Sequence, residues 1–515
     1  MYSTSTKWLL SNGILFLCLT FFQGNAQQVS QTNRYELPLE KNDYFEVMPS
    51  QEDGIFLYRR LYAATDDKLE IIKLDTAFNV NWKGYLSLDK RMQLMAKRAV
   101  GGQFYLLLRR LDVRRNNMEI YSVSQTDGAY VKYEVRNYIP FAPTEFHITE
   151  KAALIGGYFN HVPVVMSYSF AEQRSKILPG LLNEVGELTQ IKTFPDGSYD
   201  VLISARNFMK QQTVWIKSYD DEGNLQSNYA LAPEENKHLI FARAMKTEDD
   251  VQLIAGVYGG RNSEFSRGLF MASVDPDGLQ QLRYYNYGDL KNFFKYMKAK
   301  REQRVKDRIE RRKIRGKRIR FTYRFLVHEI VPYKNQYVLL GEAFYPRYRS
   351  VDPSYSFFGG RSRYPGSISG RVFDGYSYTH AVVMGFDENG KLLWDNSFEI
   401  NDVKTFTLEQ FVKLEVQEDR IALLYLFENE LRTKIIQDDQ VLEGKTFEPI
   451  RTKLENEVVK KEETELSKLD YWYQDYFYAY GIQEITNPGT GKRRVFFINK
   501  ISASDGEGMD VERNK

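Results

Sequence analysis

Short runs with the residue chemistry of β-strands recur along this chain at a nearly constant spacing. The first five runs begin at residues 54, 103, 152, 200 and 251, which lie 49, 49, 48 and 51 residues apart. A period near 50 residues predicts a repeat architecture, in which each unit buries its apolar faces against its neighbours. Eight runs follow the pattern: 54–58, 103–107, 152–156, 200–203, 251–255, 336–340, 420–424 and 476–480.

Several strand signals fall within each period, which favours the blades of a β-propeller. A second strand follows each run, and in several units an Asp/Asn-Gly turn suited to a hairpin follows next, at 126–128, 221–223, 275–278 and 387–390. The segment 387–394 resembles the blade-closing hairpins of secreted bacterial propellers, as does the weaker segment 75–82. We predict an all-β propeller of eight four-stranded blades. Seven blades, or a row of separate sandwiches, are the alternatives.

The last repeat is one strand short. Strand signals at 470–474, 477–485 and 494–501 supply three strands, and the segment 33–39 is expected to supply the fourth and close the ring. The predicted propeller therefore covers residues 27–504. A polar, disordered tail is expected over residues 505–515.

The first 26 residues match a cleavable secretory signal. Lys7 precedes an apolar run over residues 8–22, and the small-residue ending 24–26 fits a cleavage site. The run of about 15 residues is shorter than the roughly 20 that a membrane-spanning helix needs, and no later segment is apolar enough to span a membrane. We expect cleavage after Ala26 and a location in the periplasm or on the outer surface of a bacterial cell envelope.

The spacing of the repeats breaks in three places, and the first break holds a basic segment. Residues 291–320 contain 15 Lys/Arg and three acidic residues, a net charge of +12, while the rest of the chain sums to −9. Phe294, Met297, Val305 and Ile309 recur roughly at helical spacing, which predicts a helix with a narrow apolar stripe.

This basic segment has two interpretations. It is either a solvated helix docked on the propeller or a surface that binds an anionic partner. The candidate binding residues in it are Arg311, Arg312, Lys313 and Arg315.

The second break, residues 344–378, is rich in aromatic residues and arginine. Ten aromatics and five arginines are interleaved with glycine and proline. Aromatic faces and arginine forks are typical of interface hot spots and of sugar stacking, although a loop that covers its own blade would have a similar composition. The candidate binding residues here are Tyr355, Phe357, Phe358, Arg361 and Arg363.

The third break, residues 453–470, has four apolar residues near one helical face, with six acidic and four basic residues around them. It predicts a short packed helix whose acidic side would neutralise part of the basic segment.

With strands lettered a to d outward from the axis, 291–320 and 453–470 are d-to-a links and 344–378 is a b-to-c loop. Both kinds of connection emerge on the same side of a propeller. We therefore expect one insertion-bearing face, and we expect binding there because binding residues concentrate on loops held by a rigid scaffold.

No catalytic residue, metal site or cofactor is predicted. The five histidines lack HExxH spacing. His147, His238 and His328 are expected on innermost strands, where alternation gives each an even chance of facing the channel. Residues 275–278 and 488–492 lack the ligands of calcium and phosphate loops, so both are interpreted as turns. Cys18, the only cysteine, lies in the signal, which excludes disulfides and thiolate sites from the mature chain.

Two classes of function remain. The first is a non-enzymatic binding or scaffold protein of the bacterial envelope, which engages a protein or an anionic glycan or lipid surface, and not nucleic acid, through its insertion-bearing face. The alternative is a carbohydrate-active enzyme with its site at the propeller channel. Clustered carboxylates in the channel would favour the enzyme, and a bare channel with a decorated rim would favour the binding protein.

Overall fold

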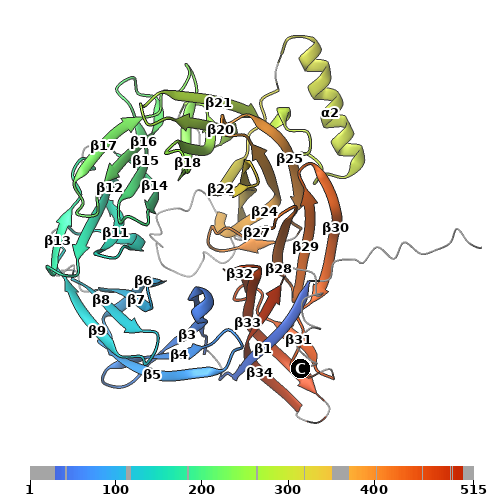
Figure 1. The fold of residues 1–515 in the computed structure, drawn as a ribbon. Coiled ribbons are helices and arrows are strands. Elements are labelled where there is room, and N and C mark those ends of the chain that lie inside the picture. Colours follow the sequence, from blue (N-terminus) through green and yellow to red (C-terminus); the bar gives the residue numbers. More distant parts are fainter. Residues whose placement is uncertain are drawn as a thin grey trace, which may run out of the picture.

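The computed structural model describes residues 29–502 except 41–42, 112–116, 138, 182–184, 262–264, 318, 351–370, 402, 455, 488 and 490. The predicted signal and tail lie outside these residues. Within the described chain, antiparallel strands form eight sheets arranged in a ring (Figure 1). The protein is an eight-bladed β-propeller, so the predicted fold class is confirmed, with eight blades and not seven.

The blades follow one another along the chain, and each has strands a to d in order from the channel outward. Blades 1 to 4 contain β2 (Glu46–Pro49), β3 (Ile55–Leu61), β4 (Asp67–Leu74) and β5 (Val80–Leu88); β6 (Met92–Val100), β7 (Gln103–Arg110), β8 (Met118–Ser124) and β9 (Tyr130–Val135); β10 (Ala142–Ile148), β11 (Ala152–Phe159), β12 (Val162–Ser169) and β13 (Arg174–Ile177); and β14 (Gly186–Thr193), β15 (Tyr199–Arg206), β16 (Gln212–Tyr219) and β17 (Leu225–Ala230).

Blades 5 to 8 contain β18 (His238–Lys246), β19 (Gln252–Gly259), β20 (Ser266–Val274) and β21 (Gln280–Asn286); β22 (Arg324–Tyr333), β23 (Gln336–Ser350), β24 (Arg371–Phe386) and β25 (Leu392–Glu399); β27 (Lys413–Val416), β28 (Ile421–Phe427), β29 (Glu430–Gln437) and β30 (Gln440–Pro449); and β32 (Lys468–Tyr473), β33 (Tyr476–Asn487), β34 (Gly491–Ser502) and β1 (Ser30–Pro38). Four further elements are η1 (Gln51–Asp53), η2 (Tyr287–Asp289), β26 (Lys404–Thr405) and β31 (Val458–Glu462). The remaining helix is α2 (Ala299–Ile314).

The eight runs found in the sequence are the eight b strands. Alternate residues of a strand point to opposite faces, and both faces of each b strand are covered by neighbouring blades. In β3, Ile55 and Leu57 pack toward blade 8, while Phe56 and Tyr58 pack toward blade 2. Each of the eight apolar clusters lies between two adjacent blades. The b strands therefore read as continuous apolar runs because they are buried on both faces.

The ring closes through the N-terminal strand. β1 pairs antiparallel with β34 from Ser30↔Ser502 to Pro38↔Val495, which makes it the outer strand of the last blade (Figure 1). This confirms the predicted role of residues 33–39. The closure unites segments more than 450 residues apart in sequence.

The c–d hairpins have the predicted turn chemistry. In the turn after β24, the Asp387 carboxylate accepts hydrogen bonds from the backbone N–H groups of Asn389 (3.0 Å) and Lys391 (2.8 Å). Gly390 has φ +70°, a value at which a side chain would be strained. The segment 275–278 forms the equivalent turn, in agreement with its interpretation as a hairpin.

The third insertion is not the helix that the sequence predicted. Its residues form β31, a turn and the start of β32, and both strands pair with the inner side of β33. β33 continues past Tyr480, the partner of the first residue of β32. The backbone groups of this continuation pair with β31, which contains the β-branched residues Val458 and Val459.

The acidic side chains of the third insertion also have other partners than predicted. Glu457 pairs with Arg493, and Glu463 pairs with Arg494 at 2.9 Å. Both arginines lie on β34, so these carboxylates compensate the closing blade and not the basic segment.

One charged cluster stabilises the ring closure. The Arg34 side chain is 6% exposed and ion-pairs with Glu36 at 2.6 Å. It also donates to Gln483 Oε1 (2.8 Å) and Asn499 Oδ1 (2.9 Å) on β33 and β34. We expect Arg34→Met to lower the free energy of unfolding by about 3–5 kcal/mol, because buried acceptors lose their cation.

Chemical denaturation would measure this loss. The matched control is Lys492→Met on β34, whose cation is 63% exposed and pairs with Glu484. That change should cost less than about 1 kcal/mol, as is typical of exposed pairs. Equal losses for the two variants would contradict a special role for the buried cluster.

Candidate functional site

The three insertions emerge from the connections that the sequence predicted. Residues 291–320 join β21 to β22, residues 453–467 join β30 to β32, and the connection from β23 to β24 contains the second insertion. In each blade the d-to-a links and b-to-c loops leave on one side of the ring. We refer to this side as the insertion-bearing face.

A buried carboxylate fixes the root of the basic segment to blade 6. Asp395 on β25 accepts hydrogen bonds from the backbone N–H groups of Lys291 (2.8 Å) and Asn292 (2.6 Å). The Asn292 side chain returns a bond to the carbonyl of Asp395 at 2.5 Å. Burial raises the pKa of Asp395, and the two backbone donors oppose that shift. The insertion therefore starts from a defined position.

Aromatic side chains continue this attachment. Phe293 and Phe294 are fully buried in the cluster between blades 5 and 6, and Met297, Val305 and Ile309 pack against the same cluster. The predicted apolar stripe is therefore real, although only its last two members lie within α2. The helix itself has no buried residue.

His380 on β24 lies inside this aromatic root. Its ring stacks on Tyr296 with a centroid distance of 3.9 Å and meets Phe293 edge-on at 4.7 Å. Thr379 Oγ1 lies 2.9 Å from His380 Nδ1. Burial lowers the pKa of His380 to about 3, so the imidazole is neutral.

The predicted cationic residues lie on exposed surface. α2 carries eight Lys/Arg and three Asp/Glu, and the candidate residues at its end, Arg311, Arg312, Lys313 and Arg315, are all exposed. Among the described residues, one ion pair lies within the helix, between Lys306 and Glu302 at 2.6 Å. Figure 1 shows α2 outside the ring, beside β21 and β25. Cations in the last turn also stabilise a helix through its dipole, so part of this charge is structural.

The predicted aromatic contact residues Tyr355, Phe357, Phe358, Arg361 and Arg363 lie outside the described residues. The flanking parts of that insertion are extensions of β23 and β24, which stay paired as far as Ser350↔Arg371. β26 adds to the β24 extension through Tyr376↔Thr405. The insertion therefore begins as a rigid hairpin rather than as a loop.

Exposed apolar side chains concentrate on the same face. Phe208 is 96% exposed and Met209 81% exposed in the b–c loop of blade 4, and Tyr62 is 83% exposed in that of blade 1. Large exposed hydrophobics also occur in several further b–c loops and d–a links, at Leu111, Val185, Phe265, Phe406, Leu408 and Leu454. On the opposite side, the described a–b and c–d loops contribute Leu279. The sequence analysis did not predict that exposed apolar residues gather on one side, because this difference between the two sides depends on the side from which each loop leaves the ring.

The inner strands carry polar residues at one level of the ring. Seven inner strands place a charged or amide residue opposite the fourth or fifth residue of their b strand, and β22 adds Glu329 at its bulge. The seven are Glu46, Lys97, Glu145, Gln190, Arg243, Lys413 and Lys468. This level of the inner strands is therefore polar, which the sequence analysis did not predict.

In blades 4 to 6 the polar side chains of this layer bond to one another and to neighbouring backbone. Glu329 of blade 6 accepts from Gln190 of blade 4 at 2.8 Å and lies 3.4 Å from Lys192. Arg243 of blade 5 donates to the carbonyl of Thr189 at 2.7 Å and lies 3.8 Å from Glu329. These bonds tie the inner strands of blades 4 to 6 to one another.

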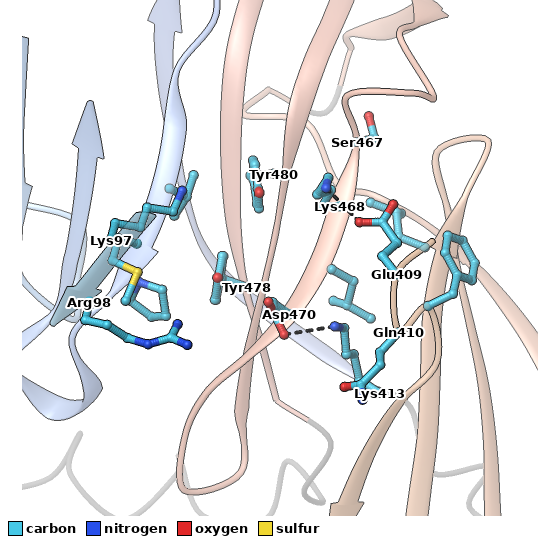
Figure 2. A pocket seen from close by; sticks show the side chains of 16 residues that line it. Lys97, Arg98, Glu409, Gln410, Lys413, Ser467, Lys468, Asp470, Tyr478 and Tyr480 are labelled. Atoms are coloured by element: carbon cyan, nitrogen blue, oxygen red, sulfur yellow. Dashed lines mark hydrogen bonds and ion pairs between the residues drawn. The ribbon is translucent and has the colours of Figure 1, made fainter. Parts of the chain in front are cut away.

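Another part of the layer encloses a cavity of about 370 Å³ between blades 7, 8, 1 and 2 (Figure 2). Its lining includes four cations and two carboxylates together with Tyr478 and Tyr480. Glu409 pairs with Lys468 at 2.7 Å, and Asp470 pairs with Lys413 at 3.1 Å. Sequence reasoning did not select these residues, because single charges in short inner strands resemble ordinary edge residues.

The three histidines expected on inner strands lie there, but they do not form a cluster. His147 lies 3.3 Å from Glu145, and His328 lies 3.2 Å from the buried Glu342 of β23. His238 Nδ1 accepts a bond from the backbone of Gln212 at 3.0 Å. In the described part of the chain, no three His, Cys, Asp or Glu side chains are arranged to hold a metal ion. None of its helices is long and apolar enough to cross a membrane.

Comparison with known proteins gives structural likeness alone. No protein-family model matches the sequence, and no curated protein matches it. The polysaccharide lyase Uly1 is similar over 80% of this chain and 90% of its own, with 10% identity and a TM-score of 0.40. The propeller domain of the Trilobed protease from Pyrococcus furiosus is similar over 81% and 99%, with 10% identity and a TM-score of 0.37.

A prolyl endopeptidase is similar over 80% of this chain and half of its own, with 9% identity and a TM-score of 0.36. Likeness this distant says nothing of activity. The propeller assignment rests on the strand pairing itself.

The buried histidine predicts how acid affects stability. Unfolding returns the pKa of His380 from about 3 to about 6.5, so the unfolded chain binds the proton between these pH values. The neutral, buried His380 costs no stability above pH 6.5. As the pH falls from 6.5 toward 3, protonation of the unfolded chain lowers the free energy of unfolding by about 1.4 kcal/mol per pH unit. Relative to wild type, His380→Phe should therefore gain about 2 kcal/mol between pH 7 and pH 5.

Urea unfolding at the two pH values measures this gain. Burial raises the pKa of the neighbouring Tyr296, which stays neutral throughout. Phe293→Leu is the control, because it disturbs the same aromatic root without removing a titrating group. A difference between wild type and His380→Phe that is the same at both pH values would contradict the assignment.

Proposed function

We propose that this protein is an exported binding protein of the bacterial cell envelope, which holds an acidic protein partner on its insertion-bearing face. The observation that carries the proposal is the joint occurrence there of exposed cations on α2 and exposed apolar side chains in the loops. Export itself rests on the signal pattern of residues 1–26.

The combination of charge and apolar surface favours a protein over other anionic partners. A lipid or glycan surface would be met by charge alone, whereas Phe208 and Met209 offer apolar area to a partner that has its own apolar patches. The rigid attachment of the basic segment at Asp395 keeps the two features in a fixed relation. A preorganised surface loses less entropy when it binds.

A carbohydrate-active enzyme has less support. Glycoside hydrolysis needs one carboxyl group kept protonated beside another that is ionised. The carboxylates that line the cavity, Glu409 and Asp470, are each ion-paired with a lysine. Each carboxylate of this cavity therefore has a cation as its partner.

Charge reversal on α2 should slow partner association. The partner is first identified by affinity purification of the tagged protein from its own envelope fraction, and binding kinetics are then measured over a range of salt. We expect Arg311→Glu/Arg312→Glu to reduce the association rate about tenfold at low salt and to flatten its salt dependence. The matched control is Arg174→Glu/Lys176→Glu on β13, which changes the same charge on the outer rim. Equal slowing by both pairs would indicate a net-charge effect and count against α2.

Loss of the exposed apolar side chains should affect the dissociation rate of the partner. We expect Phe208→Ser/Met209→Ser to raise the dissociation rate about tenfold with little change in association, because short-range packing is lost after contact forms. Leu279→Ser is the control, since Leu279 is 66% exposed on the opposite side. If the double variant dissociates at the wild-type rate, the partner binds elsewhere.

A further inference from the structure

The cavity between blades 7, 8, 1 and 2 has one cation more than its carboxylates compensate. Lys413 and Lys468 pair with Asp470 and Glu409. Lys97 pairs with Glu46 at 2.8 Å. Arg98 is the fourth cation of the lining, and no ion pair or hydrogen bond joins its guanidinium to a described residue.

The Arg98 guanidinium lies where a ligand would meet it. Figure 2 shows it reaching from β6 into the cavity, toward the side formed by Tyr478 and Asp470. In the strand register, Arg98 lies opposite Tyr105, the third residue of β7, and Asp470 lies opposite Tyr478, the third residue of β33. Arg98 and Asp470 therefore lie at the same level along the ring axis. Asp470 is already held by Lys413 and does not compensate the arginine.

The surroundings of Arg98 make its charge costly without a ligand. The side chain is half-buried, and burial lowers the pKa of the guanidinium, while Glu145 on the next inner strand opposes that shift. Glu145 is itself 3.3 Å from His147. A guanidinium with free donors in a semi-enclosed site matches a carboxylate, which it binds with two parallel hydrogen bonds.

The remaining lining favours a hydroxylated ligand. Gln410, Ser467 and the two tyrosines contribute polar groups beside the ion pairs, and Val47 and Leu469 contribute apolar walls. A cavity of about 370 Å³ is within the range of small-molecule sites. We propose that this cavity binds a sugar acid, with Arg98 holding its carboxylate. Glu409, Gln410 and Ser467 belong to d–a links of the insertion-bearing face, but the lining includes no residue of α2 and neither Phe208 nor Met209. The two proposals therefore rest on different residues and are tested separately.

Calorimetry with a matched pair of probes tests the site. D-glucuronate and D-glucuronamide differ in charge at one position, so we expect saturable 1:1 binding of glucuronate and binding of the amide weaker by about tenfold or more. Arg98→Gln should weaken glucuronate binding about tenfold and leave the affinity for the amide unchanged. Lys492→Gln, on the exposed part of β34, is the control and should change neither.

A second variant is expected to strengthen glucuronate binding by making the cavity more positive. Asp470→Asn frees Lys413 and adds one net positive charge to the cavity, so glucuronate should bind more tightly. A merely structural role for these residues gives no such gain. Melting curves of each variant show whether it folds.

Three results would overturn the proposal. They are no saturable binding of glucuronate to the wild-type protein, equal binding of glucuronate and its amide, and sulfate binding as tightly as glucuronate, which would indicate a plain anion site. The partner-binding kinetics of α2 variants are unaffected by any of these outcomes.

Discussion

The backbone ladder between β1 and β34 connects the two ends of the described chain, and the rest of the ring depends on it. Every apolar cluster lies between two blades, so each blade needs a neighbour on both sides. Without β1 the last blade would lack its fourth strand, and no strand of blade 8 would be joined through the chain directly to blade 1. The buried cluster of Arg34, Glu36 and Arg493 fixes that register with directional bonds.

The closed ring also determines where function is available. Both faces of each b strand are used for packing, which leaves the channel, the outer strands and the connections between strands as free surface. The connections on one side are short turns stabilised by local bonds, as at Asp387. Those on the other side contain the insertions and most of the exposed apolar loop residues. The proposed partner surface is therefore separated from the packing that keeps the ring folded.

The channel is organised by charge pairing rather than by apolar packing. A pair such as Lys468 and Glu409 is favourable in a partly buried site because each charge offsets the desolvation of the other. Arg98, next to Lys97 of this layer, has no such ion pair among the described residues, which is why it carries the ligand proposal.

The sequence by itself determined the repeat, the strand type and the closure. The eight b strands were visible because burial on both faces requires continuous apolar runs, and the missing strand of the last unit identified residues 33–39. It also placed a helix in the basic segment, because the stripe through Val305 and Ile309 is a local, periodic signal.

Tertiary structure alone decided the rest. The apolar residues of 453–470 have helical spacing, yet Val458 lies in a strand because its backbone pairs with the free edge of β33. The residues near Val458 in the sequence do not indicate that this edge is available. Arg98 and Asp470 come from blades 2 and 8 and line one cavity only because the ring closes. A site built from residues 372 positions apart follows from curvature and register, which are properties of the whole assembly of blades and not of any one segment.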